Sequence, residues 1–194
     1  MAVFLETERL RLREFEDRDV TALVELDSDP EVMFHLNGGR ATSAQEIRDD
    51  VLPYMLSWYS RPGRFGYWAV EEKAAGRFVG WFHLRPGRRR ASPPGAEIGY
   101  RFRRDVWGRG YATEGTRALI DKAFADLGVE RVFAETMAVH TASRRVMEKA
   151  GLRYLRTFHA EWPDKIPGDE LGDVEYALTR EQWTNEHEIE SRFT

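Results

Sequence analysis

A strand–helix–strand unit in the second half of the chain constrains the fold more than any other feature. The pattern predicts a strand over 96–102, a helix over 112–127 and a second strand over 131–138. Apolar residues of the predicted helix share one face, which is typical of a helix that packs against a sheet. The connection is long enough for a parallel crossover, and such crossovers are right-handed in nearly all folds. The sequence therefore predicts a layered α/β or α+β fold that contains a parallel strand pair.

The remaining pattern predicts further strands and helices around this unit. The predicted helices begin near Asp17 and Ser43 and span 112–127 and 142–150; Asp29-Pro30 should end the first helix, and Pro53 should kink the second. We expect one domain over 1–180 and a polar tail over 181–194. The predicted strands, about seven in one mixed sheet, are 7–13, 65–71, 77–84, 96–102, 131–138, 154–162 and 174–179.

Composition excludes several kinds of site and partner. The chain has 194 residues and no cysteine, which excludes disulfides, thiolate metal sites and a cysteine nucleophile, and we expect no metal. Charges begin at Glu6, and no apolar run approaches the ~20 residues of a membrane helix. We therefore expect a cytoplasmic protein without a signal peptide or membrane contact. The formal net charge of −4 argues against general affinity for nucleic acid.

Two glycines mark the most informative turn, which precedes the predicted helix over 112–127. Gly108 and Gly110 lie within the segment 107–113, and glycine lets a backbone approach a ligand closely and adopt left-handed angles. A helix start presents unpaired amides and a partial positive charge, which suit a diphosphate. A plain glycine turn is the alternative, because the segment lacks the ending of a Walker loop and the third glycine of a dinucleotide fingerprint.

Three segments in the expected order resemble the GNAT acetyltransferases, and most of all their RimJ/RimL-type branch. They are ETERLRLR over 6–13, the strand and glycine turn over 98–114, and HTASRRVMEKAGL over 140–152, which is similar to the family's Asn-x-Ala-Ser-x-Arg-Val-x-Glu-Lys-x-Gly-Phe. The resemblance implies the GNAT fold, in which helices flank a mixed central sheet with a splayed parallel pair. It also implies acetyl-CoA as cosubstrate, with pantetheine entering between the splayed strands.

The resemblance further implies which residues contact acetyl-CoA. Backbone groups near Phe102 would pair with the pantetheine amides, and His140 and Ser143 would lie near the thioester. Nearby cations could reach the nucleotide phosphates, although most such residues are simply solvated. The favoured cation is Arg109, joined by one of Arg103, Arg104, Arg144 and Lys149. The amides expected to hold the pyrophosphate are those of Gly108, Arg109, Gly110, Tyr111, Ala112 and Thr113.

The implied activity is direct transfer of the acetyl group to a primary amine, on a small molecule or a protein N-terminus, by a chain that can form a homodimer. Two departures from the family pattern keep an alternative open. His140, which could titrate near neutrality, replaces an asparagine, and Met147 replaces a tyrosine that many relatives use. The alternative is a catalytically silent acyl-CoA-binding module used in regulation. A third interpretation is an unrelated nucleotide-phosphate binder, which ATP or NAD would stabilise as strongly as CoA does.

Direct transfer requires a base for the amine, donors for the oxyanion and an acid for the thiolate. Ser143 is the candidate acid by its place in the family motif, with helix capping as its alternative role. Glu97 and Glu135 are the candidate bases, and each could instead pair with an arginine across the sheet. His83 and Glu161 are further candidates, and the amine could also arrive neutral and lose its proton through water.

Aromatic residues of the predicted second helix are candidates for the acceptor site. Their spacing is typical of core residues, but in GNAT folds this helix walls the acceptor pocket, so Trp58 and Tyr59 are expected to line it. The basic run over 88–90 is interpreted as a solvated loop or as a lip for an acidic acceptor.

Overall fold

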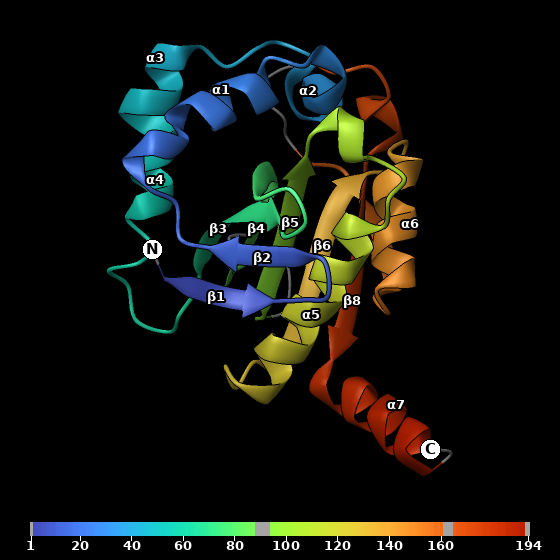
Figure 1. Cartoon of the computed structure of the whole chain (residues 1–194). Helices are drawn as coiled ribbons and strands as arrows, with labels where there is room; N and C mark the ends of the chain where they lie inside the picture. The colour runs from blue at the N-terminus through green and yellow to red at the C-terminus, as the bar shows by residue number, and fades with distance from the viewer. Residues whose placement is uncertain (1, 88–93, 161–164, 193–194) are drawn as a thin grey trace.

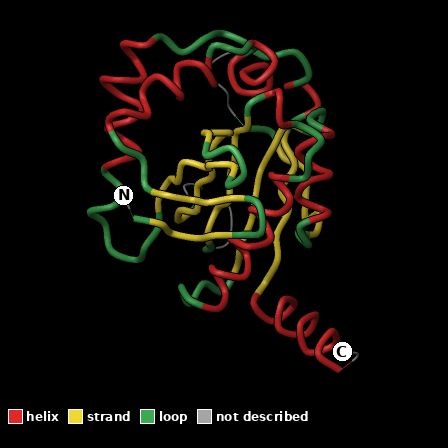
Figure 2. Tube along the Cα trace, in the orientation of Figure 1, coloured by secondary structure: helices red, strands yellow, loops and turns green. Residues whose placement is uncertain are grey.

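One mixed sheet forms the centre of the computed structural model, which describes residues 2–87, 94–160 and 165–192 (Figures 1 and 2). The sheet has eight strands in the order β1-β2-β3-β4-β5-β6-β8-β7. β5 and β6 form its parallel pair, and the other neighbouring strands are antiparallel. The strands are β1 (Val3–Glu6), β2 (Leu10–Arg13), β3 (Gly66–Glu72), β4 (Arg77–Pro86), β5 (Ala96–Phe102), β6 (Arg131–Met137), β7 (Arg153–Phe158) and β8 (Asp173–Thr179).

An N-terminal hairpin accounts for the difference from the seven predicted strands. The run predicted as a single strand over 7–13 begins with a turn, in which Thr7 N–H donates to the Leu10 carbonyl at 2.9 Å. The Thr7 hydroxyl in turn accepts from Leu10 N–H at 3.0 Å. β1 was missed because its four residues are exposed or half-buried, whereas β2 has the buried Leu10 and Leu12 that produce a clear alternation.

Four short helices pack on one face of the sheet over β3 and β4. Their core includes Tyr67, Ala69 and Trp81 of those strands. The Asp29-Pro30 pair begins a helix as well as ending one, because the Asp29 carboxylate accepts from Glu31 N–H at 3.0 Å and proline suits the first helical position. The helices are α1 (Val20–Asp27), α2 (Pro30–Asn37), α3 (Ala44–Glu46) and α4 (Leu52–Leu56), with a 3₁₀ turn at Asp17–Asp19 before them.

The predicted second helix is divided rather than continuous. A π-helical segment, Ile47–Val51, separates α3 from α4, and Pro53 lies in the first turn of α4. Proline cannot donate to the regular hydrogen-bond pattern, so the helix changes its winding just before it.

The opposite face is covered by α5 (Tyr111–Ala125) and α6 (Thr141–Lys149), which share one core with the strands. Each follows a strand of the parallel pair, and 3₁₀ turns lie at Arg104–Val106 and Asp169–Leu171. The predicted polar tail forms α7 (Arg180–Arg192), which projects from the sheet in Figure 1. Its Trp183 donates to Asp121 of α5 at 2.8 Å. Within the described ranges, none of the helices combines the length and apolar character needed to span a membrane.

Gly115 lets α5 lie close to the sheet. A Cβ built at this position would lie 2.3 Å from Cε2 and 2.5 Å from Cζ of Phe82. The Phe82 ring is itself fully buried and has little room to move. The close approach at Gly115 therefore sets how close the N-terminal half of α5 lies to the sheet.

We expect Gly115→Ala to lower the free energy of unfolding by about 1–3 kcal/mol, because overpacking against Phe82 outweighs the helix propensity that alanine adds. Urea unfolding followed by circular dichroism measures the change. Ala125→Ser adds one atom to the exposed side of the same helix and is the matched control, with an expected change below about 0.5 kcal/mol. Equal stability of Gly115→Ala and the unmodified chain would contradict the close contact.

Candidate active site

The corner between β5 and α5 presents unpaired backbone amides. Gly108 and Gly110 both adopt left-handed angles, with φ of 75° and 83°, which other residues adopt only with strain. Gly110 is the N-cap of α5, and the first hydrogen bond of this helix runs from Glu114 N–H to the Gly110 carbonyl at 2.9 Å. No side chain in the described part of the chain caps the helix, so the N–H groups of residues 111–113 point outward. Together with the helix dipole they suit an anion.

Arg9, in the turn between β1 and β2, reaches this corner from the other end of the chain. Its Nη1 donates to the Arg109 carbonyl at 3.0 Å and its Nε to a Glu114 oxygen at 2.6 Å. Its guanidinium lies 4.8 Å from the centre of the Tyr111 ring. Arg109 is exposed and lies 3.7 Å from a Glu72 oxygen, so two guanidinium groups border the outward amides. Sequence reasoning missed Arg9 because the contact spans 100 residues.

The other predicted phosphate-binding cations are paired elsewhere or exposed. Arg103 pairs with a carboxylate of α1 at 2.9 Å, and Arg104 with a carboxylate of α2 at 2.7 Å. Arg144 donates to the Tyr176 hydroxyl at 3.1 Å. Lys149 is exposed at the end of α6. Of the predicted set, Arg109 is therefore the cation that the structure places at the corner.

β5 and β6 separate soon after they pair, as the resemblance implies. Their register contains two pairs, Ala96 with Val132 and Glu97 with Phe133, although each strand has seven residues. On their outer edges, β5 pairs with β4 and β6 pairs with β8 along their whole lengths. The two parallel strands thus stay in the sheet while a gap opens between them.

Backbone groups of β5 face this gap. Arg103 N–H donates to the Val79 carbonyl at the end of the β4–β5 ladder. Because an antiparallel ladder alternates, the N–H and C=O groups of residues 98, 100 and 102 then point toward β6. The Phe102 carbonyl accepts from the Trp107 indole at 2.9 Å, which fixes the chain where it leaves the strand. The pairing of Glu97 with Phe133 uses the Ile98 N–H, because a parallel ladder bonds to the residues on either side of the paired one. The Ile98 carbonyl and both backbone groups of Tyr100 lie beyond it, so they are placed to bind an amide-bearing ligand.

Ser143 and Tyr100 meet on the α5 side of the gap. Ser143 is buried in the first turn of α6, and its hydroxyl lies 3.0 Å from the Tyr100 hydroxyl. His140 is the N-cap of α6 and, in the described part of the chain, no side-chain hydrogen bond caps this helix, so the Ser143 hydroxyl pairs with tyrosine. Burial raises the pKa of Tyr100, which keeps its hydroxyl protonated. Sequence reasoning considered a tyrosine only at the position of Met147, which is buried, and missed the one that β5 contributes.

His140 packs against a second histidine. Its ring stacks on that of His35 from α2, with centroids 4.0 Å apart and planes 17° apart. Burial, helped by the neighbouring His35, lowers the pKa of His140 to about 4. Contrary to the expectation of titration near neutrality, the imidazole is therefore uncharged at pH 7.

The two candidate carboxylate bases lie on the sheet face turned away from α5. Burial alone would raise the pKa of Glu97, but His83 and the Arg85 guanidinium, 3.1 Å away, outweigh it and hold this pKa at about 2. Glu97 is therefore charged and a weak proton acceptor. Glu135 lies on β6 opposite Glu175 of β8, on the same face by register. Glu161, a further candidate, lies outside the described residues.

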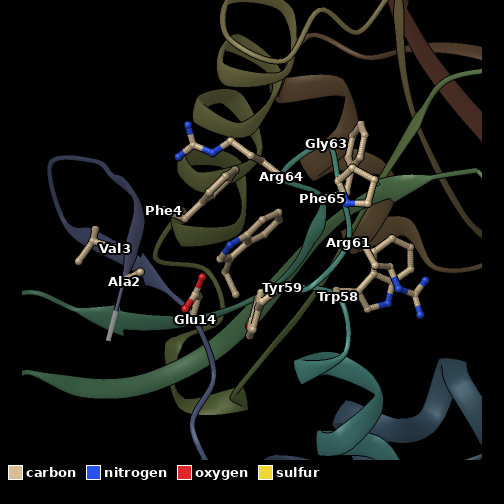
Figure 3. Close-up of a pocket in the computed structure, with 12 residues that line it drawn as sticks. Ala2, Val3, Phe4, Glu14, Trp58, Tyr59, Arg61, Gly63, Arg64 and Phe65 are labelled. Carbon is tan, nitrogen blue, oxygen red and sulfur yellow. The ribbon is translucent and has the colours of Figure 1, made fainter.

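Trp58 and Tyr59 line a different cavity. It has a volume of about 350 Å³ and lies between the N-terminal segment and the loop over 61–65 (Figure 3). The Tyr59 hydroxyl accepts from Phe15 N–H at 2.9 Å and donates to a β3 carbonyl, which ties this ring to the scaffold. The basic run over 88–90 lies outside the described residues. The structure thus groups the corner, the gap, Ser143 and the two carboxylates. Trp58 is linked to the sheet face of these carboxylates through Tyr67, whose ring centroid lies 6.3 Å from that of Trp58, so the assignment of the two aromatics to the acceptor site stays a prediction.

Comparison with known proteins adds a family match. Residues 9–153 match the model of the acetyltransferase (GNAT) domain. FsC-acetyl coenzyme A-N(2)-transacetylase of Aspergillus fumigatus is 39% identical over 186 residues, which cover 92% of this chain and 77% of that protein.

Solved structures share the architecture. A GNAT-family acetyltransferase from Bacillus anthracis is 26% identical, with a TM-score of 0.75 over 92% of this chain and 99% of its own. RimL, a ribosomal L7/L12 alpha-N-protein acetyltransferase solved with coenzyme A, has a TM-score of 0.74 over 93% of this chain and 99% of its own. It is 19% identical, so this likeness shows the fold alone.

The stability of the protein should fall between pH 7 and pH 5 because of His140. Its pKa is about 4 in the folded chain against an ordinary value of 6.5, so in this window the unfolded chain binds a proton that the folded chain does not. The loss begins as the pH drops below the ordinary value and reaches about 2 kcal/mol for His140 at pH 5. Urea unfolding at both pH values measures it. His140→Asn should remove this share, and an undiminished loss in that variant would assign the effect to other groups.

Proposed function

Because the chain belongs to the GNAT acetyltransferase family, we propose that it transfers the acetyl group of acetyl-CoA directly to the primary amine of a small molecule or of a protein N-terminus. It is an acetyl-CoA-dependent N-acetyltransferase. The observation that carries the proposal is a splayed strand pair that leads to an uncapped helix start. We also assign it to the RimJ/RimL-type branch, on the strength of the three sequence segments and with support from the shared fold of RimL.

The corner amides would hold the pyrophosphate of acetyl-CoA. The N–H groups of residues 111–113 point outward at the positive end of a helix dipole, whereas the Arg109 N–H donates to the Val106 carbonyl at 3.4 Å. A Cβ at Gly108 would meet nothing within 4 Å, so a ligand can approach the backbone there. Arg109 and Arg9 add positive charge beside these amides. A diphosphate has several oxygens that can accept from these amides.

The gap between β5 and β6 would take the pantetheine arm. Its amides need both donors and acceptors, and the backbone of Tyr100 supplies both, with the Ile98 carbonyl and the Phe102 N–H beside it. His140, just beyond the end of β6, would border the arm near its thiol end. Acetyl-CoA supplies an activated thioester, so no protein nucleophile is required, in agreement with a chain that lacks cysteine.

Ser143 and Tyr100 would protonate the departing thiolate. The Ser143 hydroxyl can pass its proton to sulfur and recover one from the Tyr100 hydroxyl 3.0 Å away. Backbone N–H groups of β5 that face the gap would stabilise the oxyanion.

The acceptor would approach from the other sheet face, where Glu97 and Glu135 lie. Transfer to nitrogen is supported by the Aspergillus relative, whose name specifies an N(2)-transacetylase.

Release of free thiol from acetyl-CoA tests this function. The panel of acceptors should include diamines, amino acids and peptides with free N-termini. The chain has no cysteine, so a thiol-reactive chromophore reports CoA without background from the protein. We expect thiol release with at least one amine and an acetylated product in the mass spectrum. Binding of acetyl-CoA without release for any amine would instead support the silent binding module.

Gly110→Glu should weaken CoA binding by about 100-fold or more, because it sets a carboxylate against the pyrophosphate and like charges cost several kcal/mol. Isothermal titration calorimetry with CoA measures the loss. Gly110→Gln has the same bulk and the same backbone strain without the charge, so it is the matched control and should lose less. Thermal unfolding confirms that both variants fold. CoA affinity of folded Gly110→Glu equal to that of the unmodified chain would remove the corner from the site.

Ser143→Ala should lower kcat by about 10- to 100-fold while CoA binding changes little, because a proton donor acts in the transition state. Tyr100→Phe should lower kcat less, since Ser143 keeps its own proton. Steady-state rates at saturating acetyl-CoA and calorimetry with CoA separate the two effects. Unchanged kcat in Ser143→Ala would limit this residue to packing.

A further inference from the structure

A buried histidine on β4 is not explained by the contacts described so far. His83 lies opposite Gly99 of β5, on the sheet face turned away from α5. It is 7% exposed, and neither of its ring nitrogens has a hydrogen-bond partner within the part of the chain that the structure describes. A buried polar group without a partner destabilises the folded chain. Such a group in a folded protein calls for a role other than stability.

The imidazole of His83 is held firmly in place. The ring occupies the space beside Gly99, where a Cβ would lie 2.3 Å from the imidazole Cε1. Tyr67 packs against it edge-on at 5.2 Å between ring centroids, and Trp81 lies nearly parallel at 5.9 Å. The imidazole thus packs against the bare backbone of Gly99 and between two aromatic rings.

A carboxylate stands beside this ring. The Glu97 Oε1 atom is 3.6 Å from His83 Nε2, and Arg85 Nη2 holds the same oxygen at 3.1 Å. The separation from the imidazole is longer than a hydrogen bond, as is common for catalytic pairs before substrate binds. A fixed carboxylate at this position stabilises an imidazolium when one forms.

The pair lies where β5 and β6 begin to part. Glu97 belongs to the last pair of the parallel register, and Gly99, beneath the His83 ring, lies two residues into the gap. The histidine therefore borders the space in which an acetyl group between the strands would meet an amine. Ser143 reaches the same gap from the opposite face of β5, through Tyr100.

We propose that His83 accepts the proton of the attacking amine, and that Glu97, itself held by Arg85, is its positioning residue. This inference rests on the proposed function. The amine nitrogen forms a bond to the acetyl carbon, the carbon–sulfur bond breaks, and the nitrogen proton passes to His83. The sulfur takes a proton from Ser143, which recovers one from Tyr100, and solvent returns one proton to this hydroxyl pair. His83 releases its proton to solvent, so the protons balance over the cycle. The products are an N-acetyl amine and free CoA thiol.

The charges around the ring suit a proton acceptor. Burial lowers the pKa of His83, so at pH 7 the imidazole is neutral and has a free lone pair. Glu97 favours the protonated ring, whereas Arg85 and Arg101 oppose it. Tyr67, the other titratable group against the ring, stays neutral because burial raises its pKa. The proton taken from the amine is thus held for a short time and then released.

His83→Gln tests the proposal. We expect kcat to fall by about 100-fold or more, as for loss of a general base, while calorimetry shows unchanged CoA affinity. In the pH–rate profile, the fall in rate at low pH that reflects protonation of His83 (the enzyme's acidic limb) should disappear. The fall that reflects protonation of the acceptor amine should remain. His159→Gln makes the same change at an exposed histidine and should keep the kcat of the unmodified chain.

Glu97→Gln provides a second test that does not depend on the folding of His83→Gln. Loss of the carboxylate lowers the basicity of His83, so the enzyme's acidic limb should move to lower pH with a smaller fall in kcat. A merely structural role would not move that limb. An acidic limb in the same place in Glu97→Gln, or a kcat within a few-fold of the unmodified chain in folded His83→Gln, would overturn the proposal. Absence of thiol release by the unmodified chain with every amine would instead overturn the proposed function.

Discussion

The separation of β5 from β6 is the constraint on which the rest of the structure depends. Neighbouring strands normally satisfy each other's backbone groups, yet this pair is joined at two register positions and then diverges. Full pairing with β4 and β8 on the outer edges keeps both strands in place. The sheet can therefore hold an opening at its centre without an unpaired strand, and the outward amides of α5 lie where β5 leaves the sheet.

The alternation of β5 divides the reaction between two faces. Even-numbered side chains point toward α5 and α6, where Tyr100 meets the buried Ser143. Odd-numbered side chains point the other way, where Glu97 lies beside His83. In the proposed mechanism, the proton donor for sulfur and the proton acceptor for nitrogen thus stand on opposite sides of one strand. Both groups would reach a ligand that lies in the plane of the sheet, each from its own face.

Local patterns predicted most of the fold, and long-range contacts account for what they did not predict. The parallel unit, its crossover helix and the glycine corner follow from residues close in sequence, because helix periodicity and turn chemistry act locally. β1 was missed because a half-exposed strand has little hydrophobic contrast. The contacts of Tyr100 and His83 depend on how strands far apart in the sequence pair with each other. A short stretch of sequence does not contain that information. The family motif directed attention to Met147 for a tyrosine that the sheet supplies from elsewhere.

Arg9 joins the first turn of the chain to the glycine corner across 100 residues. If this hydrogen bond favours the form of the corner that binds the ligand, docking of the hairpin and binding of the ligand are coupled. Each then stabilises the other by the same amount of free energy. The Arg109 carbonyl has this hydrogen bond only while the N-terminal hairpin is docked, because the Arg9 guanidinium belongs to the hairpin turn. The first turn of the chain carries no motif for phosphate binding. It nevertheless stabilises the loop that is proposed to hold the cofactor.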